Sequence, residues 1–94
     1  RIEVFVPEPK RIYGYYVFPI LEGTNLIGRI DVKAFRDAST LRIKAFWPET
    51  GIALTQSRRA KLDAELNRLA NFAGCDRVEY LPEWERETLR AVSI

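Results

Sequence analysis

Residues 26–35 read LIGRIDVKAF, and they decide the fold because apolar and polar side chains alternate along them. Successive side chains of a β-strand point to opposite faces of a sheet. The alternation predicts one face formed by Leu26, Gly28, Ile30, Val32 and Ala34, and a second formed by Ile27, Arg29, Asp31, Lys33 and Phe35. We therefore expect a β-strand with one face in the core and one face in water.

The segments on either side of this strand complete a sheet. Residues 41–47 alternate again, which predicts that Leu41, Ile43, Ala45 and Trp47 point inward and that Arg42, Lys44 and Phe46 point outward. Residues 37–39 form a turn cluster between the two strands, and residues 22–25 form another before the first. Residues 15–21 are apolar on both sides, which favours a strand that is covered on both faces, with an edge or a bulge at Pro19. The result is a three-stranded meander, to which the alternating residues 2–6 can add a strand.

One amphipathic helix is predicted from about Gln56 to Ala73. Its apolar stripe consists of Leu62, Leu66, Leu69, Ala70 and Ala73. Thr55 or Ser57 can cap its start, and Gly74 can provide a left-handed stop. Residues 77–81 can return as a last strand, and residues 83–92 form a charged terminal helix or tail. These elements define an α+β fold.

The size of the chain permits one domain with a modest core, since it has 94 residues. It begins at Arg1, inside a strand-like run, and contains no methionine, so we expect residues 1–94 to be one domain of a longer parent. The longest apolar stretch, residues 13–21, is interrupted by Gly14 and Pro19 and is too short to cross a membrane. The single Cys75 excludes an internal disulfide and fits a cytoplasmic protein.

The composition argues against catalysis by this chain alone. It has no histidine and one cysteine, which excludes the usual zinc-site spacings and the histidine-activated nucleophiles. The five glycines are isolated, so no phosphate-binding loop is present. The sequence therefore predicts no catalytic residue, no metal site and no cofactor.

Positive charge is concentrated in the first two thirds of the chain. Residues 10–61 contain ten lysines and arginines against four acids, whereas residues 62–94 contain four against seven. Such asymmetry indicates a surface suited to a polyanion, although an ordinary solvated face accounts for it equally well. Two places stand out as candidate nucleic-acid contacts. One is the run at residues 10–16, where Lys10, Arg11 and Tyr13 mix cations with an aromatic ring. The other is the outward face of the predicted sheet, with Arg29, Lys33, Arg42 and Lys44 against the single acid Asp31.

Three segments carry a resemblance to a known family: RIEVFVP at residues 1–7, PKRIYGYYVFPIL at residues 9–21 and LIGRIDVKA at residues 26–34. Together they resemble the C-terminal region of the YcaQ-like, crosslink-repair DNA glycosylases, which are winged-helix proteins. The resemblance implies a small, barrel-like antiparallel sheet packed by the helix, placed after tandem winged-helix domains. It also implies that the parent removes alkylated or crosslinked bases by hydrolysing the N-glycosidic bond.

The family's catalytic Gln-x-Gln motif is absent, because the only glutamine is Gln56 and Arg58 stands two places later. Two hypotheses follow. In the first, this chain is a non-catalytic accessory domain that contacts DNA, with the winged-helix domains of the parent as its intramolecular partners. In the second, it is a structural or protein-interaction module that packs on neighbouring domains and does not touch DNA. Neither hypothesis needs a membrane or a small-molecule cofactor.

Overall fold

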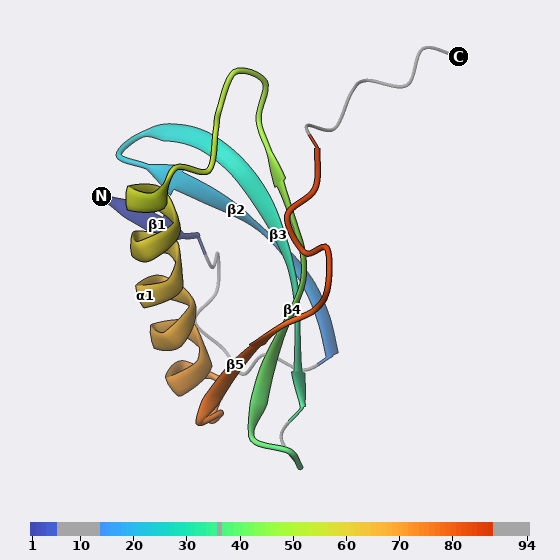
Figure 1. Cartoon of the computed structure of the whole chain (residues 1–94). Helices are drawn as coiled ribbons and strands as arrows, with labels where there is room; N and C mark the ends of the chain where they lie inside the picture. Colours follow the sequence, from blue (N-terminus) through green and yellow to red (C-terminus); the bar gives the residue numbers. More distant parts are fainter. Residues whose placement is uncertain (6–13, 36, 88–94) are drawn as a thin grey trace.

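A computed structural model describes residues 1–5, 14–35 and 37–87. Five strands form one sheet in the order β1-β2-β3-β4-β5, with a single helix after the fourth strand. Their bounds are β1 Ile2–Val4, β2 Gly14–Glu22, β3 Asn25–Phe35, β4 Thr40–Pro48, α1 Gln56–Phe72 and β5 Arg77–Tyr80. The pairs β1–β2, β2–β3 and β3–β4 are antiparallel, whereas β4–β5 is parallel. The sheet curls into a half-barrel around α1 (Figure 1), so the α+β, barrel-like prediction is confirmed.

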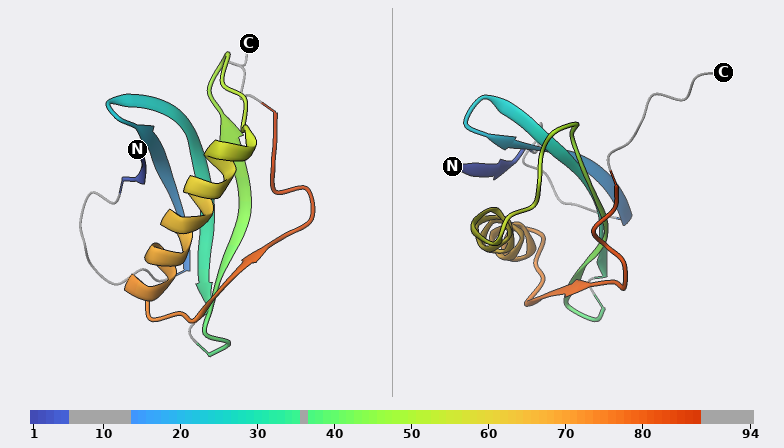
Figure 2. Two further views of the ribbon diagram at one scale, coloured as in Figure 1. Left: turned by 60° about the vertical axis from the view of Figure 1, so that its left-hand side comes forward. Right: turned by 45° about the horizontal axis from the view of Figure 1, so that its top comes forward.

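The concave side of the sheet faces α1 (Figure 2), and the core residues of the sheet and the helix lie between them. The predicted helical stripe is correct: Leu62, Leu66, Leu69, Ala70 and Ala73 are all buried. They pack against sheet residues that include Ile20, Ile30, Val32, Leu41, Ile43 and Phe46. Burial of this shared apolar surface is the main source of stability in a domain of this size.

Both ends of α1 follow from its sequence. The Thr55 side chain accepts a hydrogen bond from the backbone N–H of Arg58 at 3.2 Å, so Thr55 is the N-cap. At the other end Gly74 has a φ of 78°. The Cys75 N–H donates to the Ala70 carbonyl at 2.8 Å, and the Gly74 N–H donates to the Asn71 carbonyl at 3.1 Å. These two bonds form a Schellman motif, which satisfies the last carbonyls of the helix.

Two β-bulges correct the predicted faces of β3 and β4. Leu21 pairs with Leu26 and Ile20 pairs with Gly28, so Ile27 is an extra residue in β3. As a result Ile27 is buried and Leu26 is exposed, the reverse of the strict alternation. A bulge of this kind adds one residue to one strand and shifts the alternation beyond it by one.

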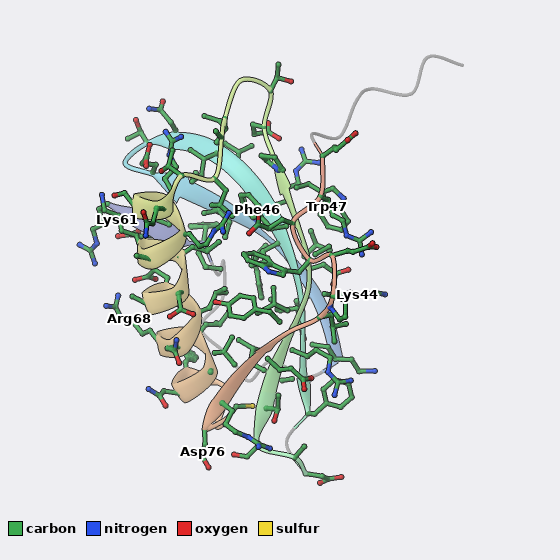
Figure 3. All side chains as sticks on the ribbon, viewed as in Figure 1. Lys44, Phe46, Trp47, Lys61, Arg68 and Asp76 are labelled. Atoms are coloured by element: carbon green, nitrogen blue, oxygen red, sulfur yellow. The ribbon has the colours of Figure 1, made fainter. Side chains whose placement is uncertain are left out.

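The second bulge lies in β4, where Lys44 is the extra residue: Val32 pairs with Ile43 and Asp31 pairs with Ala45. Beyond it Phe46 pairs with Ile30 and is buried, whereas Trp47 pairs with the exposed Arg29. The sequence-based placement of Phe46 outside and Trp47 inside was therefore wrong. The side chains of Phe46 and Trp47 leave β4 on opposite sides (Figure 3).

The edges of the sheet also differ from the expectation. β2 is not covered on both faces, because Val17 is 58% exposed. Pro19 does lie beside a bulge, and its carbonyl accepts a hydrogen bond from Phe5 just past the end of β1. The predicted last strand is present as β5. Of the predicted terminal helix or tail at residues 83–92, residues 83–87 form no helix, and residues 88–92 lie outside the described residues.

Candidate nucleic-acid interface

The face of β2, β3 and β4 that points away from α1 is called the outer face below, and it carries the predicted basic residues. Lys33 of β3 pairs with Arg42 of β4, and Arg29 pairs with Trp47. Arg29 and Lys44 are exposed, while Lys33 and Arg42 are partly exposed. Lys44 lies on the far side of the molecule from Lys61 and Arg68, which belong to α1 (Figure 3). The outer face thus gathers four cations on two neighbouring strands.

An aromatic ring organises part of this surface. The Nζ atom of Lys33 lies 5.0 Å from the centre of the Phe35 ring, and the Cζ atom of Arg42 lies 4.4 Å from it. Cations within about 6 Å of a ring face are attracted by the ring's quadrupole. Phe35 therefore offsets part of the repulsion between two like charges that sit directly opposite each other.

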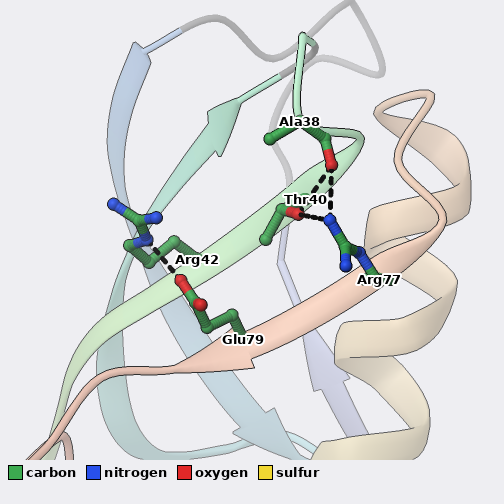
Figure 4. Close-up of polar contacts among 5 residues, drawn as sticks. All are labelled: Ala38, Thr40, Arg42, Arg77 and Glu79. Atoms are coloured by element: carbon green, nitrogen blue, oxygen red, sulfur yellow. Dashed lines mark hydrogen bonds and ion pairs between the residues drawn. The ribbon is translucent and has the colours of Figure 1, made fainter.

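Arg42 has a further partner that the sequence did not reveal. Its Nε donates to the Oε1 of Glu79 at 2.6 Å (Figure 4), because β5 pairs with β4 in a register that sets Glu79 beside Arg42. Beside this pair, Arg77 of β5 donates to the Ala38 carbonyl at 3.0 Å and to Thr40 Oγ1 at 3.3 Å, which ties β5 to the β3–β4 turn (Figure 4). Glu79 thus neutralises one of the four cations of the outer face.

The acid predicted on this face also has an unusual environment. Asp31 pairs with Val17 on one side and with Ala45 on the other. Its Oδ1 atom is buried and has no hydrogen-bond partner in the part of the chain that the structure describes. The carboxylate therefore sits low in the surface, between Arg29 and Lys33 along the strand.

Most of the basic residues of α1 are paired with acids. Arg58 donates from Nε and Nη2 to the two oxygens of Glu22, at 3.1 and 3.0 Å. This hydrogen-bonded pairing holds the pKa of the Glu22 carboxyl below its usual value and raises the pKa of the Arg58 guanidinium. Arg59 pairs with Glu85 at 2.9 Å, and Arg68 pairs with Glu65. Three of the four basic residues of α1 therefore have an acidic partner.

The sequence-predicted contacts divide into two groups. Arg29, Lys33, Arg42 and Lys44 come together on one face, as their alternation indicated. Lys10, Arg11 and Tyr13 lie outside the described residues. The features missed from the sequence are Glu79 and the position of Trp47. The first depends on a strand pairing between distant segments, and the second depends on a bulge, so strand alternation alone could not reveal either.

Two kinds of site are absent from the described ranges 1–5, 14–35 and 37–87. No cluster of three or more cysteine, aspartate or glutamate side chains there could hold a metal ion. Within the same ranges no helix is long and apolar enough to cross a membrane.

Comparison with known proteins gives one family. The family model described as DNA glycosylase AlkZ-like matches residues 1–72, which is more than half of the chain. The match covers β1 to β4 and ends with the last residue of α1. No solved structure matches the chain.

Proposed function

This chain belongs to the AlkZ-like DNA glycosylase family, and from that membership we propose that its outer face contacts the phosphate backbone of DNA without performing the hydrolysis. A glycosylase acts on a base that has been extruded from the duplex, and this requires a pocket for the base and a group that activates water. The sequence lacks histidine and the Gln-x-Gln motif. We assign the chemistry to another part of the parent protein and the holding of DNA to this domain.

The observation that carries the proposal is the gathering of Arg29, Lys33, Arg42 and Lys44 on one face of two adjacent strands. Like charges that face each other across a sheet are destabilising, so this arrangement brings no advantage to folding. Lysine and arginine side chains provide most of the contacts that proteins make with phosphate oxygens. The twisted outer face of β3 and β4 therefore provides a cationic surface for a nucleic-acid backbone.

The four cations are expected to contribute unequally. Arg29 and Lys44 are the most exposed of the four, so their side chains are the most accessible to a phosphate backbone. Arg42 is held by Glu79 and must exchange that carboxylate for a phosphate. The contacts are with phosphate and not with base edges, so binding should be independent of sequence.

The test measures binding of duplex DNA across a range of salt concentrations. It compares the 94-residue chain with a double variant that carries both Lys33→Glu and Lys44→Glu. Each lost phosphate contact should reduce the steepness of the slope of log K against log salt concentration by about 0.9. The slope of the double variant should therefore be less steep by about 1.8. The matched control is Lys61→Glu with Arg68→Glu, which makes the same change in net charge on α1. The control should retain most of the salt slope.

The structural alternative makes the opposite prediction. If this domain only packs on neighbouring domains, both double variants should lower DNA affinity equally, through net charge alone. Equal slopes for the two variants would therefore refute the outer face as the DNA contact. They would leave the family assignment unchanged, because it rests on residues 1–72 and not on these lysines.

A further inference from the structure

A groove of about 430 Å³ lies on the side of the molecule where α1 faces the segment after β5. One wall is a stripe of α1 that includes Arg59, Ala60 and Asp63, and the other consists of Tyr80, Trp84 and Glu85. The α1 residues are exposed, whereas Tyr80 and Trp84 are half-buried. These six residues define what we call the Trp84 groove.

Two aromatic rings form the base of the Trp84 groove. The ring centres of Tyr80 and Trp84 lie 4.7 Å apart, with their planes tilted by 44°. Backbone hydrogen bonds fix Trp84 in place, because its N–H donates to Leu81 at 3.2 Å and its carbonyl accepts from Phe46 at 2.6 Å. The Tyr80 hydroxyl donates to Asp63 Oδ1 at 2.6 Å across the groove. Both rings are thus held in position before any ligand arrives.

The polar rim of the groove is acidic. Asp63 and Glu85 provide two carboxylates, and Arg59 offsets one of them by pairing with Glu85 at 2.9 Å. Asp63 uses Oδ1 to accept from Tyr80, and its Oδ2 atom makes no hydrogen bond within the described part of the chain. The rim therefore carries a net negative charge beside two aromatic rings.

Aromatic faces next to a carboxylate are the surroundings that a guanidinium or ammonium group favours. We propose that the Trp84 groove is a docking site for a protein partner, and that it receives an arginine or lysine side chain from that partner. The cation would lie against Trp84 and donate to Asp63 Oδ2, while its aliphatic stem covers Ala60. This inference does not depend on the proposed DNA contact, which uses the opposite face of the sheet.

Charge excludes a nucleic acid from this groove. Residues 59–87, which supply the groove, contain seven aspartates and glutamates against five lysines and arginines. A phosphate backbone would be repelled here, although a base could stack on an aromatic ring. A basic segment of a protein can place a cation against the aromatic rings and donate hydrogen bonds to the carboxylates.

The experiment measures the indole N–H resonance of Trp84 by ¹H–¹⁵N NMR in the 94-residue chain, with Trp47→Phe used to assign it. The probe is Nα-acetyl-arginine N-methylamide, and the neutral comparison is the matching citrulline amide. We expect a saturable shift with the arginine probe and at least about tenfold weaker binding of the citrulline probe, the effect of one hydrogen bond to a charged group.

Two variants make the result specific. Asp63→Asn keeps an acceptor for Tyr80 but removes the charge, and it should weaken binding of the arginine probe by about tenfold. Asp76→Asn removes the same charge from an exposed position outside the groove and should leave the affinity unchanged. Thermal unfolding of each variant checks that the fold is retained. The proposal would be overturned by equal shifts with both probes, or by no shift at all. Equal weakening of arginine binding by both variants would also overturn it, and so would a shift of the Trp84 resonance produced by short DNA.

Discussion

Gly28 of β3 and Phe46 of β4 are packed so closely that Gly28 has no room for a side chain. A Cβ atom on Gly28 would lie 2.7 Å from two carbons of the Phe46 ring and 2.6 Å from the carbonyl oxygen of Trp47. Gly28 directly follows the bulged Ile27. The missing side chain lets the Phe46 ring turn under β3 and fill the core.

We expect Gly28→Ala to destabilise the domain by about 1–3 kcal/mol, because overpacking a filled site forces neighbouring atoms apart. The ring of Phe46 can move, but the Trp47 carbonyl belongs to the backbone and can give less. Chemical denaturation of both proteins measures the change. An unchanged free energy of unfolding would mean that β3 and β4 are less tightly packed than described.

Leu66 is the centre of the helical stripe and is fully buried. Replacing it with alanine leaves a cavity between α1 and the sheet, and such changes cost about 2–5 kcal/mol. In a domain of this size that loss should lower the melting temperature by about 10 °C or more. The exposed Lys61→Ala on the same helix should change the melting temperature little. Comparable melting temperatures for the Leu66→Ala and Lys61→Ala variants would contradict the packing of Leu66 against the sheet.

These two sites show what strand and helix periodicity could predict. The stripe of α1 was predictable because a single helix has a fixed period, and Leu62, Leu66 and Leu69 follow it. The predicted faces hold in β3 after its bulge, from Gly28 to Phe35, and in β4 before its bulge, from Leu41 to Ile43. The alternation shifts by one at Ile27 and at Lys44. Pro19 and Gly28 lie near the first bulge and are the residue types that mark one, whereas no such residue marks the second.

The pair of Glu22 and Arg58 should make stability depend on acid pH. The pKa of Glu22 is lower in the folded protein than in the unfolded chain. Its contribution is therefore present above the unfolded pKa of about 4.3 and is lost as the pH falls through the folded value. We expect Glu22→Gln to lower the melting temperature at pH 7 and to make a smaller difference below about pH 3. Glu87→Gln is the control, and a Glu22→Gln effect that is equal at both pH values would contradict the pairing.

Tyr80 should make stability depend on alkaline pH, with the opposite sign. Burial, together with its hydrogen bond to Asp63, raises the pKa of the Tyr80 phenol above its ordinary value. The stabilisation is complete below the unfolded pKa of about 10 and is lost as the pH rises toward the folded value, because only the unfolded chain releases the proton there. Tyr80→Phe should therefore flatten the decline in the free energy of unfolding above about pH 10. Parallel declines for the two proteins would show that Asp63 does not hold this hydroxyl.

Glu79 should weaken the proposed DNA contact, because it occupies Arg42 at 2.6 Å. Changing it to glutamine removes a competing carboxylate while keeping its shape. We expect Glu79→Gln to increase duplex affinity by about two- to fivefold, the range that an exposed ion pair allows. Glu83→Gln removes the same charge from an exposed site away from Arg42 and should have a smaller effect. Equal gains in duplex affinity for Glu79→Gln and Glu83→Gln would mean that Glu79 acts only through the net charge of the protein.

The candidate site was predictable to the same degree as the strands that carry it. Strand alternation placed Arg29, Lys33 and Arg42 on one face correctly. The pairing of Arg42 with Glu79 joins residues 37 positions apart, and it depends on a parallel strand that no hairpin turn announces. Contacts between distant segments depend on which strands pair in the folded sheet. The alternation of residues along one strand does not contain that information.

The parallel pairing of β4 with β5 also sets an order of assembly. Short turns join β2 to β3 and β3 to β4, so these hairpins close quickly. β5 is separated from β4 by the whole of α1, so its pairing with β4 is expected to be slower. During synthesis the N-terminal strands emerge first. Arg42 would then be exposed on a finished hairpin before Glu79 leaves the ribosome. The nascent domain is expected to carry its strongest attraction for polyanions at that stage and to lose part of it when the last strand docks.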